Sequence, residues 1–282
     1  MDHLITNIAS YALMLLRPNT FGQIHSVYRK TINLTFGGRL LSLQAAASPI
    51  SPLSLITNLS GKEMSELNLQ PGQHVEIHSH ELLICSPDCI HRFCYDPAEI
   101  FDSALTGNFP RIHSELLKSV FSLSDTGGFR CLFSSDTDHT CSDQFLVNTY
   151  AENCLKQCNF YLENRHFDQA ADALVSLIGL GIGLTPSGDD FLCGVLAGII
   201  FANQYEHPFA RTLRTAIQRK LDHTNDISKS FLDCALNSHF SKPLKELPLK
   251  ESAAEILSSF EAIGHSSGID TLCGIYYILT HL

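Results

Sequence analysis

Residues 179 to 194 read Gly179-Leu-Gly-Ile-Gly-Leu-Thr-Pro-Ser-Gly-Asp-Asp-Phe-Leu-Cys-Gly194. The glycines permit positive φ angles and a close approach of the backbone to neighbouring groups. Thr185, Ser187 and Asp189 are residue types that cap helix N-termini, and an apolar run follows them directly. The segment therefore predicts a glycine-rich loop that opens a buried helix, whose first N–H groups suit a phosphate or carboxylate.

A second segment near the end of the chain repeats this pattern. Ser267-Gly-Ile-Asp-Thr-Leu-Cys-Gly274 matches Ser187-Gly-Asp-Asp-Phe-Leu-Cys-Gly194 in its Ser, Gly, Asp, Leu, Cys and Gly at identical spacing. This similarity suggests an internal duplication. Asp190 and Asp270 take equivalent places in the first turn of their helices, where negative charge is favoured. Gly194 and Gly274, one turn later, allow two helices to approach closely.

The repeat has two interpretations. The structural one is a symmetric packing device, in which two capped helices cross at glycines. The functional one is that both helix N-termini converge on one anionic ligand. Asp190 and Asp270 would then face a common cavity and either orient hydrogen-bond donors or bind a metal ion such as Mg²⁺.

Two further features add candidate residues. Asn225 predicts a helix cap, and Ser228 and Lys229 follow it, although a plain capped helix with a solvated lysine is an equal alternative. His265 is a candidate acid or base because its ordinary pKa lies near neutrality, although a lone histidine is more often structural. The catalytic candidates are Asp190, Asp270 and His265. The substrate-binding candidates are Gly181, Gly183, Thr185, Ser187, Gly188, Asp189, Asn225, Ser228, Lys229, Ser266, Ser267 and Gly268.

The expected fold class is α+β, in two domains. Residues 1–20 carry an apolar helical face and predict an N-terminal helix, and residues 21–85 alternate apolar and polar side chains as half-buried antiparallel strands do. Gly37-Gly38 predicts a hairpin turn, and Pro71-Gly72 a second turn. We expect a barrel-like β domain over residues 1–140 and an all-helical domain over residues 141–282, which carries the glycine-rich motifs.

Composition narrows the class of protein. Apolar residues make up 44% of the 282 residues, and the formal net charge is −10, so attraction to nucleic acid or to an anionic membrane surface is not expected. We read no signal peptide and no transmembrane span, and the ten cysteines then indicate free thiols in the cytoplasm. The spacing of Cys85, Cys89, His91 and Cys94 is not that of a zinc ribbon.

The two glycine motifs, with the Thr224-Asn225 segment between them, resemble the AllH-type subunit family of oxamate carbamoyltransferase. This resemblance covers most of the chain, and Ile182 departs from it where a proline is expected. It implies a subunit of a complex that converts oxamate and carbamoyl phosphate into oxalurate and phosphate, in anaerobic allantoin catabolism. In the cell the reverse direction would release carbamoyl phosphate for ATP synthesis.

Two other functions stay open from the sequence. A non-catalytic scaffold or regulatory subunit would use the glycine loops for packing or for subunit contact. An ATP-dependent phosphotransferase is a weaker alternative, because the chain has no standard nucleotide-binding motif. The carbamoyltransferase hypothesis is compatible with the residues for one reason. Its substrates are small anions, and the N–H groups at helix N-termini can supply the preorganised hydrogen-bond donors that bind them.

Overall fold

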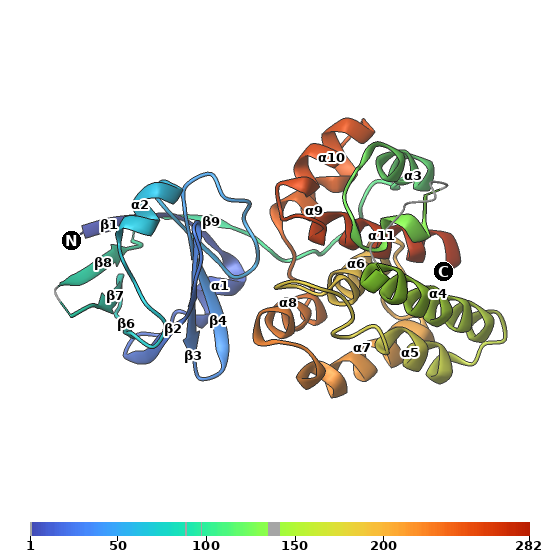
Figure 1. Ribbon diagram of the computed structural model, residues 1–282, viewed down its shortest axis with the longest axis horizontal. Coiled ribbons are helices and arrows are strands. Elements are labelled where there is room, and N and C mark those ends of the chain that lie inside the picture. Colours follow the sequence, from blue (N-terminus) through green and yellow to red (C-terminus); the bar gives the residue numbers. More distant parts are fainter. Residues whose placement is uncertain (1, 88, 97, 135–141) are drawn as a thin grey trace. The chain divides into compact units, whose positions relative to one another are not determined.

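The computed structural model describes residues 2–87, 89–96, 98–134 and 142–282 (Figure 1). The chain forms two compact units. Unit 1 holds the residues up to 104 together with 239–242, and unit 2 holds residues 105–238 and 243–282. This division differs from the predicted boundary after residue 140, because the segment around α3 (Ser114–Leu123) packs on helices of the C-terminal half.

Unit 1 is a closed, mixed β-barrel of eight strands. The ring runs β5-β4-β3-β2-β6-β7-β8-β1 and closes because β1 pairs with β5, and β9 adds to β1 outside this ring. The strands are β1 (Asp2–Ala9), β2 (Thr20–Val27), β3 (Thr31–Phe36), β4 (Arg39–Gln44), β5 (Ser54–Thr57), β6 (His74–Ile77), β7 (Glu81–Cys85), β8 (Ile90–Cys94) and β9 (Glu99–Phe101). The predicted hairpin at Gly37-Gly38 is confirmed, since Phe36 pairs with Arg39.

The predicted N-terminal helix over residues 1–20 is wrong for most of its length. Asp2–Ala9 is a strand, and only Ser10–Leu15 is helical (α1). The register of β1 shifts between Ile5 and Asn7, and this irregularity breaks the two-residue alternation of a strand. Ile5 and Ile8 consequently both face the core at a spacing of three, which resembles the period of a helix.

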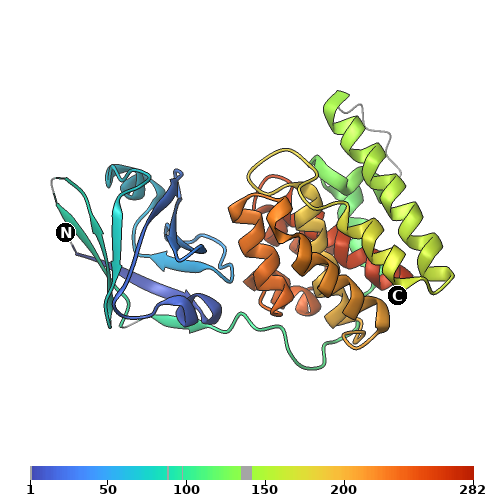
Figure 2. The same cartoon turned by 90° about the horizontal axis from the view of Figure 1, so that it is seen from below.

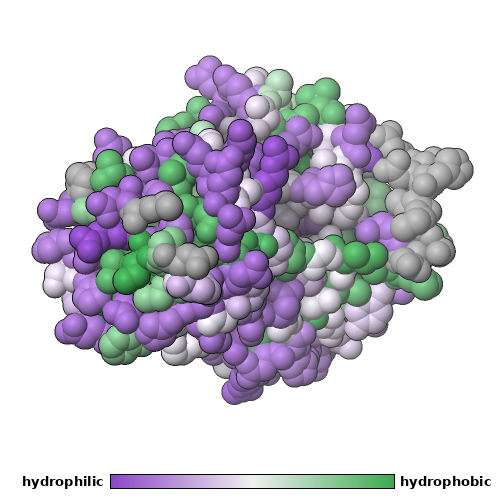
Figure 3. Space-filling model, turned by 60° about the vertical axis from the view of Figure 1, so that its left-hand side comes forward, coloured by the Kyte–Doolittle hydropathy of each residue, from purple (hydrophilic) through white to green (hydrophobic). Residues whose placement is uncertain are grey.

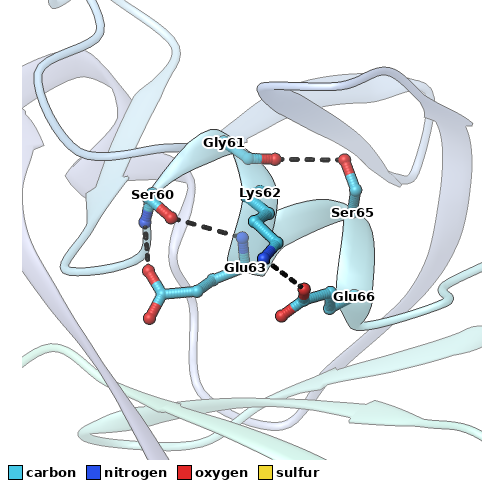
Figure 4. A network of polar contacts seen from close by, with 6 residues as sticks. All are labelled: Ser60, Gly61, Lys62, Glu63, Ser65 and Glu66. Atoms are coloured by element: carbon cyan, nitrogen blue, oxygen red, sulfur yellow. Dashed lines mark hydrogen bonds and ion pairs between the residues drawn. The ribbon is translucent and has the colours of Figure 1, made fainter.

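The short helix α2 (Gly61–Glu66) closes on itself through a capping box (Figure 4). Ser60 Oγ accepts the N–H of Glu63 at 3.3 Å, and Glu63 Oε2 accepts the N–H of Ser60 at 2.7 Å. Two helix-start donors are thereby satisfied, and the helix buries Met64 against the barrel core. The Ser-x-x-Glu pattern at Ser60 and Glu63 is visible in the sequence, but no helix was predicted there.

Unit 2 is helical, as predicted. Its α-helices after α3 are α4 (Ser142–Glu163), α5 (Phe167–Val175), α6 (Ser187–Phe201), α7 (Pro208–Lys220), α8 (Asp226–Leu236), α9 (Lys242–Glu246, which begins at the join with unit 1), α10 (Ala253–Glu261) and α11 (Ser267–His281). Short 3-10 helices lie between these α-helices: η1 (Gly128–Leu132) before α4, η2 (Leu221–His223) before α8 and η3 (Leu247–Leu249) before α10. None of the helices in the described part of the chain has the length and apolar character needed to cross a bilayer.

Helices α6 and α11 form the most extensive contact in this unit and lie side by side in Figures 1 and 2. They run parallel, because Gly194 lies against Gly274 and Gly198 lies against Ile278. A Cβ on Gly194 would overlap the carbonyl of Thr271, and a Cβ on Gly274 would overlap the carbonyl of Phe191. Residues 191 and 271 are equivalent in the repeat, so the two helices meet with local two-fold symmetry.

The hydropathy of the surface is consistent with the burial of most apolar side chains in the interior. On the face of the molecule that Figure 3 shows, hydrophilic side chains predominate and hydrophobic areas are small and scattered. Most of the apolar side chains of α6 and α11 are buried, Phe191 and Tyr277 among them.

We predict that Gly194→Ala destabilises the protein by about 3 kcal/mol, because the added methyl group forces two backbones apart. Gly274→Ala should have the same effect at the equivalent position. Urea denaturation followed by circular dichroism measures the free energy of unfolding. Gly127→Ala is the matched control, since a Cβ there meets nothing within 4 Å. A loss in the control as large as in Gly194→Ala would contradict the role of the crossing.

Candidate functional site

The parallel packing of α6 and α11 brings the two predicted helix starts together. Ser187 is the first residue of α6, and Ser267 is the first residue of α11. Thr185 Oγ1, in the loop before α6, lies 2.7 Å from Ser267 Oγ and joins that loop to the other helix. Two positive helix ends therefore lie side by side, which favours negative charge between them.

Asp190 and Asp270 supply negative charge at this place, and both are buried. Asp270 is 0% exposed and Asp190 is 9% exposed. Asp270 Oδ1 accepts the backbone N–H of Phe129 at 2.6 Å, which ties η1 to α11. In each carboxylate the buried Oδ2 has no hydrogen-bond partner among the described residues.

Burial raises the pKa of both carboxyl groups. The pKa of Asp270 rises to about 7 through burial, and the N–H of Phe129 and the hydroxyls of Ser187 and Ser266 counteract part of this rise. The pKa of Asp190 lies well above its ordinary range, first because of burial and then because Asp270 repels its charge. The hydroxyls of Ser267 and Thr185 partly oppose that shift.

The serine contacts cross between the helices in a symmetric way. Ser187 of α6 stabilises the charge of Asp270 on α11, and Ser267 of α11 stabilises the charge of Asp190 on α6. Because repulsion between the carboxylates is mutual, ionising one opposes ionising the other. The pair can therefore hold a proton near neutral pH, which is the range that a general acid or base needs.

Asp189 has a different place from its neighbour Asp190. Its Oδ1 accepts the N–H of Gly179 at 2.9 Å, and its Oδ2 accepts the hydroxyl of Thr224 at 2.5 Å. Burial raises the pKa of Asp189, whereas these hydrogen bonds and the hydroxyl of buried Ser228 oppose the rise. Asp189 thus links the glycine loop, through Gly179, to the segment just before α8, through Thr224.

Asn225 caps α8 as predicted, since its Oδ1 accepts the N–H groups of Ile227 and Ser228 at 3.0 Å each. Its Nδ2 also donates to the carbonyl of Leu184 at 3.0 Å, so the cap holds the end of the glycine loop. Lys229 forms an ion pair with the exposed Asp222. The structure therefore places the ammonium group in a surface pair.

The helix-cap prediction for Thr185, Ser187 and Asp189 is wrong. The N-cap of α6 is Pro186, and no side chain caps the helix there. All three polar side chains instead contact partners from distant segments, as described above. Ser266 holds the N-cap position of α11, also without a side-chain cap bond.

The glycines divide into two groups. Gly188 and Gly268 pack against the carbonyls of Leu177 and Phe260, where a Cβ would overlap those oxygens. Gly181 and Gly183 lie in the loop with φ of 130° and 125°, next to Ile182 and Leu184, which are 67% and 54% exposed.

The predicted candidate His265 is exposed in the link before α11, and the structure does not bring its ring into the buried pair.

The expectation of an open cavity at Asp190 and Asp270 is not confirmed, because their unpaired oxygens are sealed from solvent. Sequence reasoning also missed the residues that seal them. Gly128 packs directly on the carboxylate of Asp270, and Phe129 bonds to it, yet the sequence around Gly127-Gly128 indicates only a loop. In the described ranges, no three or more His, Cys, Asp or Glu side chains are arranged to hold a metal ion, so Mg²⁺ binding stays a prediction.

Two family models match the chain, and one of them covers this site. Residues 5–96 match the AllH family N-terminal domain, and residues 177–279 match the oxamate carbamoyltransferase subunit AllH. The chain belongs to the AllH family. The N-terminal match lies on the barrel, and the C-terminal match contains both glycine motifs of AllH. No solved structure matches the chain.

The family match also indicates how the enzyme and the chain are organised. AllH is described as a subunit of a carbamoyltransferase, so the complete enzyme contains other chains. The two matched ranges begin and end within the two compact units, since 5–96 falls in unit 1 and most of 177–279 falls in unit 2. The buried carboxylate pair therefore lies in the part of the chain that matches the carbamoyltransferase subunit.

We predict that Asp270→Asn stabilises the protein increasingly as pH rises from about 4 to about 7, and by a constant amount above that. A carboxyl whose pKa is higher in the folded state is destabilising when ionised, so wild-type stability falls as pH rises from 3.8 towards about 7. The asparagine keeps an oxygen for the N–H of Phe129 but cannot ionise. Removing the buried charge should raise the free energy of unfolding by on the order of a few kcal/mol.

Melting temperatures of both proteins across this pH range measure the difference. Asp172→Asn, which removes an exposed carboxylate from α5, is the control and should show no such trend. A difference between wild type and Asp270→Asn that stays constant with pH would show that Asp270 is not destabilised by ionisation.

Proposed function

We propose that this AllH chain binds the carbamoyl substrates of its enzyme at the joined starts of α6 and α11, and that Asp190 and Asp270 move the proton of the reaction. The observation that supports this most is the pair of unpartnered, buried carboxylate oxygens beside two helix N-termini. Leaving buried acceptors unpaired costs free energy, so a role for them in binding or catalysis gives a reason for their presence.

The chemistry of the substrates suits this combination of groups. Oxamate and carbamoyl phosphate each carry an amide NH₂ group and an anionic end. A carboxylate oxygen accepts N–H donors, whereas the N–H groups and hydroxyls at helix starts donate to phosphate or carboxylate. The Oδ2 atoms of Asp190 and Asp270 would receive the amide, and Thr185, Ser187 and Ser267 would lie towards the anionic end.

The reaction needs one proton acceptor. The amide nitrogen of oxamate attacks the carbonyl carbon of carbamoyl phosphate, the new C–N bond forms, and the bond from that carbon to the phosphate oxygen breaks. The nitrogen loses one proton, which ends on the released phosphate, and the other product is oxalurate. The carboxylate pair would take this proton from the nitrogen and return it to phosphate.

The raised pKa values match this role in both directions. A carboxyl with a pKa of about 7 is present in both protonation states at neutral pH. In the reverse direction, which we propose for the cell during anaerobic allantoin breakdown in the cytoplasm, the protonated pair would donate to the leaving nitrogen of oxamate. Oxalurate and phosphate would then give oxamate and carbamoyl phosphate.

Access to the pair requires a covering segment to move, and we propose that the loop of residues 179–185 moves, because its Thr185 contacts both Ser267 and Asp190. The end of the loop is held by Asn225 Nδ2 at Leu184 and by the contact between Thr185 and Ser267, and its start is held by Asp189 at Gly179 and by Gly188 at Leu180. Glycines at positive φ bend it, and its exposed Ile182 and Leu184 offer apolar surface to another subunit. We propose that the assembled enzyme, rather than this chain alone, holds the loop open.

We predict that Asp190→Asn and Asp270→Asn each lower kcat of the reconstituted enzyme by about 100-fold or more, because a general base contributes on that scale. Phosphate-dependent cleavage of oxalurate, followed by carbamoyl phosphate release, measures the rate. The variants should assemble with the other subunits normally, since both substitutions preserve side-chain shape.

Asp172→Asn is the matched control, because it removes a carboxylate from the same unit at an exposed position. If both site variants keep full activity in the assembled enzyme, the chain is a scaffold and the proposal fails. If they assemble and bind substrate but are inactive, the proton-transfer role is supported directly.

A further inference from the structure

A cavity of about 370 Å³ lies in unit 2 at the opposite end of α11 from the carboxylate pair. Its lining comes from the end of α4, the starts of α5 and α7, and the last turn of α11. The polar lining residues are Asn159, Glu163, Arg165, His207, Thr280 and His281. A cavity of this size is within the range that binds small molecules.

The cavity presents one cationic side chain, Arg165, and one carboxylate side chain, Glu163, in a chain whose net charge is −10. Arg165 lines it and makes no ion pair within the described residues. Helices α5, nine residues long, and α7, thirteen residues long, both begin at its wall, at Phe167 and next to His207. The first N–H groups of α5 add the positive end of one helix dipole, whereas α7 begins with Pro208 and donates the N–H of Phe209 to His207.

Hydrogen bonds fix the orientation of two imidazoles at the wall. His207 Nδ1 accepts the N–H of Phe209 at 3.3 Å, so its proton in the neutral ring is on Nε2, which is left as a donor. His281 Nδ1 donates to the carbonyl of Tyr277 at 2.9 Å, and Asn159 Nδ2 donates to His281 Nε2 at 3.3 Å. These groups are positioned before any ligand arrives, which lowers the entropic cost of binding.

Neighbouring side chains also hold the lining residues in place. The hydroxyl of Tyr277 donates to Asn159 Oδ1 at 2.5 Å, and the rings of Tyr277 and His281 stack at 4.6 Å. The ring of Phe167 lies edge-on to His207 at 5.3 Å. Glu163 is the one carboxylate side chain in the lining, and it offers an acceptor for an N–H or O–H group of the same ligand.

We infer that this cavity is a second binding site, distinct from the carboxylate pair, for a small metabolite with a carboxylate or phosphate group. Arg165 is the residue that holds the anionic group, and His207 adds a donor. The inference rests on the cavity itself and not on the proposed function.

Histidine ring signals in NMR spectra of the full chain test it, with inorganic phosphate and oxalate as separate probes. We expect the signals of His207 and His281 to shift saturably at millimolar concentrations of at least one probe, while those of His74 and His78 in the barrel do not move. Saturation by phosphate alone assigns a phosphate ligand, and saturation by oxalate alone assigns a carboxylate. The variants His207→Gln and His281→Gln identify the signals.

Arg165→Ala should weaken binding by about tenfold or more, because it removes a charge-assisted hydrogen bond. Arg219→Ala is the matched control, since it removes an exposed arginine of α7 from the same unit and should leave binding unchanged. Binding should also persist in Asp270→Asn, whatever the outcome for the proposed function. Absence of a saturable shift with both probes, an equal loss in Arg219→Ala, or loss of the shifts in Asp270→Asn would overturn the inference.

Discussion

The crossing of α6 and α11 at Gly194 and Gly274 is the contact on which the rest of unit 2 depends. No side chain separates the two backbones there, and the helices run parallel with both N-termini at one end. Two positive helix ends side by side are unfavourable unless negative charge lies near them. Asp190 and Asp270 supply that charge at equivalent positions, and each receives a serine contact from the opposite helix.

The same constraint accounts for the chemistry available at the site. Because the helices pack closely, both carboxyl groups are buried, and burial raises the pKa of Asp270 to about 7 and, together with the charge of Asp270, raises the pKa of Asp190 well above its ordinary range. Asp189, one residue earlier, is also buried and its pKa is also raised by burial, but Gly179 and Thr224 donate hydrogen bonds to both of its oxygens. Adjacent residues of one type thus have separate roles: Asp189 holds the loop, and Asp190 joins a pair that can carry a proton. Packing and function are therefore not alternatives for this repeat.

The sequence predicts the parts of this arrangement that repeat or depend on neighbouring residues. The hairpin at Gly37-Gly38, the cap at Asn225 and the pairing of Gly194 with Gly274 all follow from short patterns, and the α+β class follows from periodicity. Features set by distant contacts could not be predicted. A bulge in β1 imitates helical spacing, Thr185 and Ser187 use distant partners instead of capping α6, and Phe129 reaches Asp270 from 141 residues away. The burial of Asp270 under η1 belongs to this second group.

The central claim is that Asp190 and Asp270 share a proton at neutral pH inside the folded protein. Infrared spectroscopy of the carboxylic C=O stretch, with Asp190→Asn and Asp270→Asn to assign the bands, tests it most directly. The account predicts that a buried protonated carboxyl band persists in the wild-type protein at neutral pH and weakens or vanishes in each variant. A wild-type protein in which both carboxyl groups are already fully ionised well below neutral pH would contradict it.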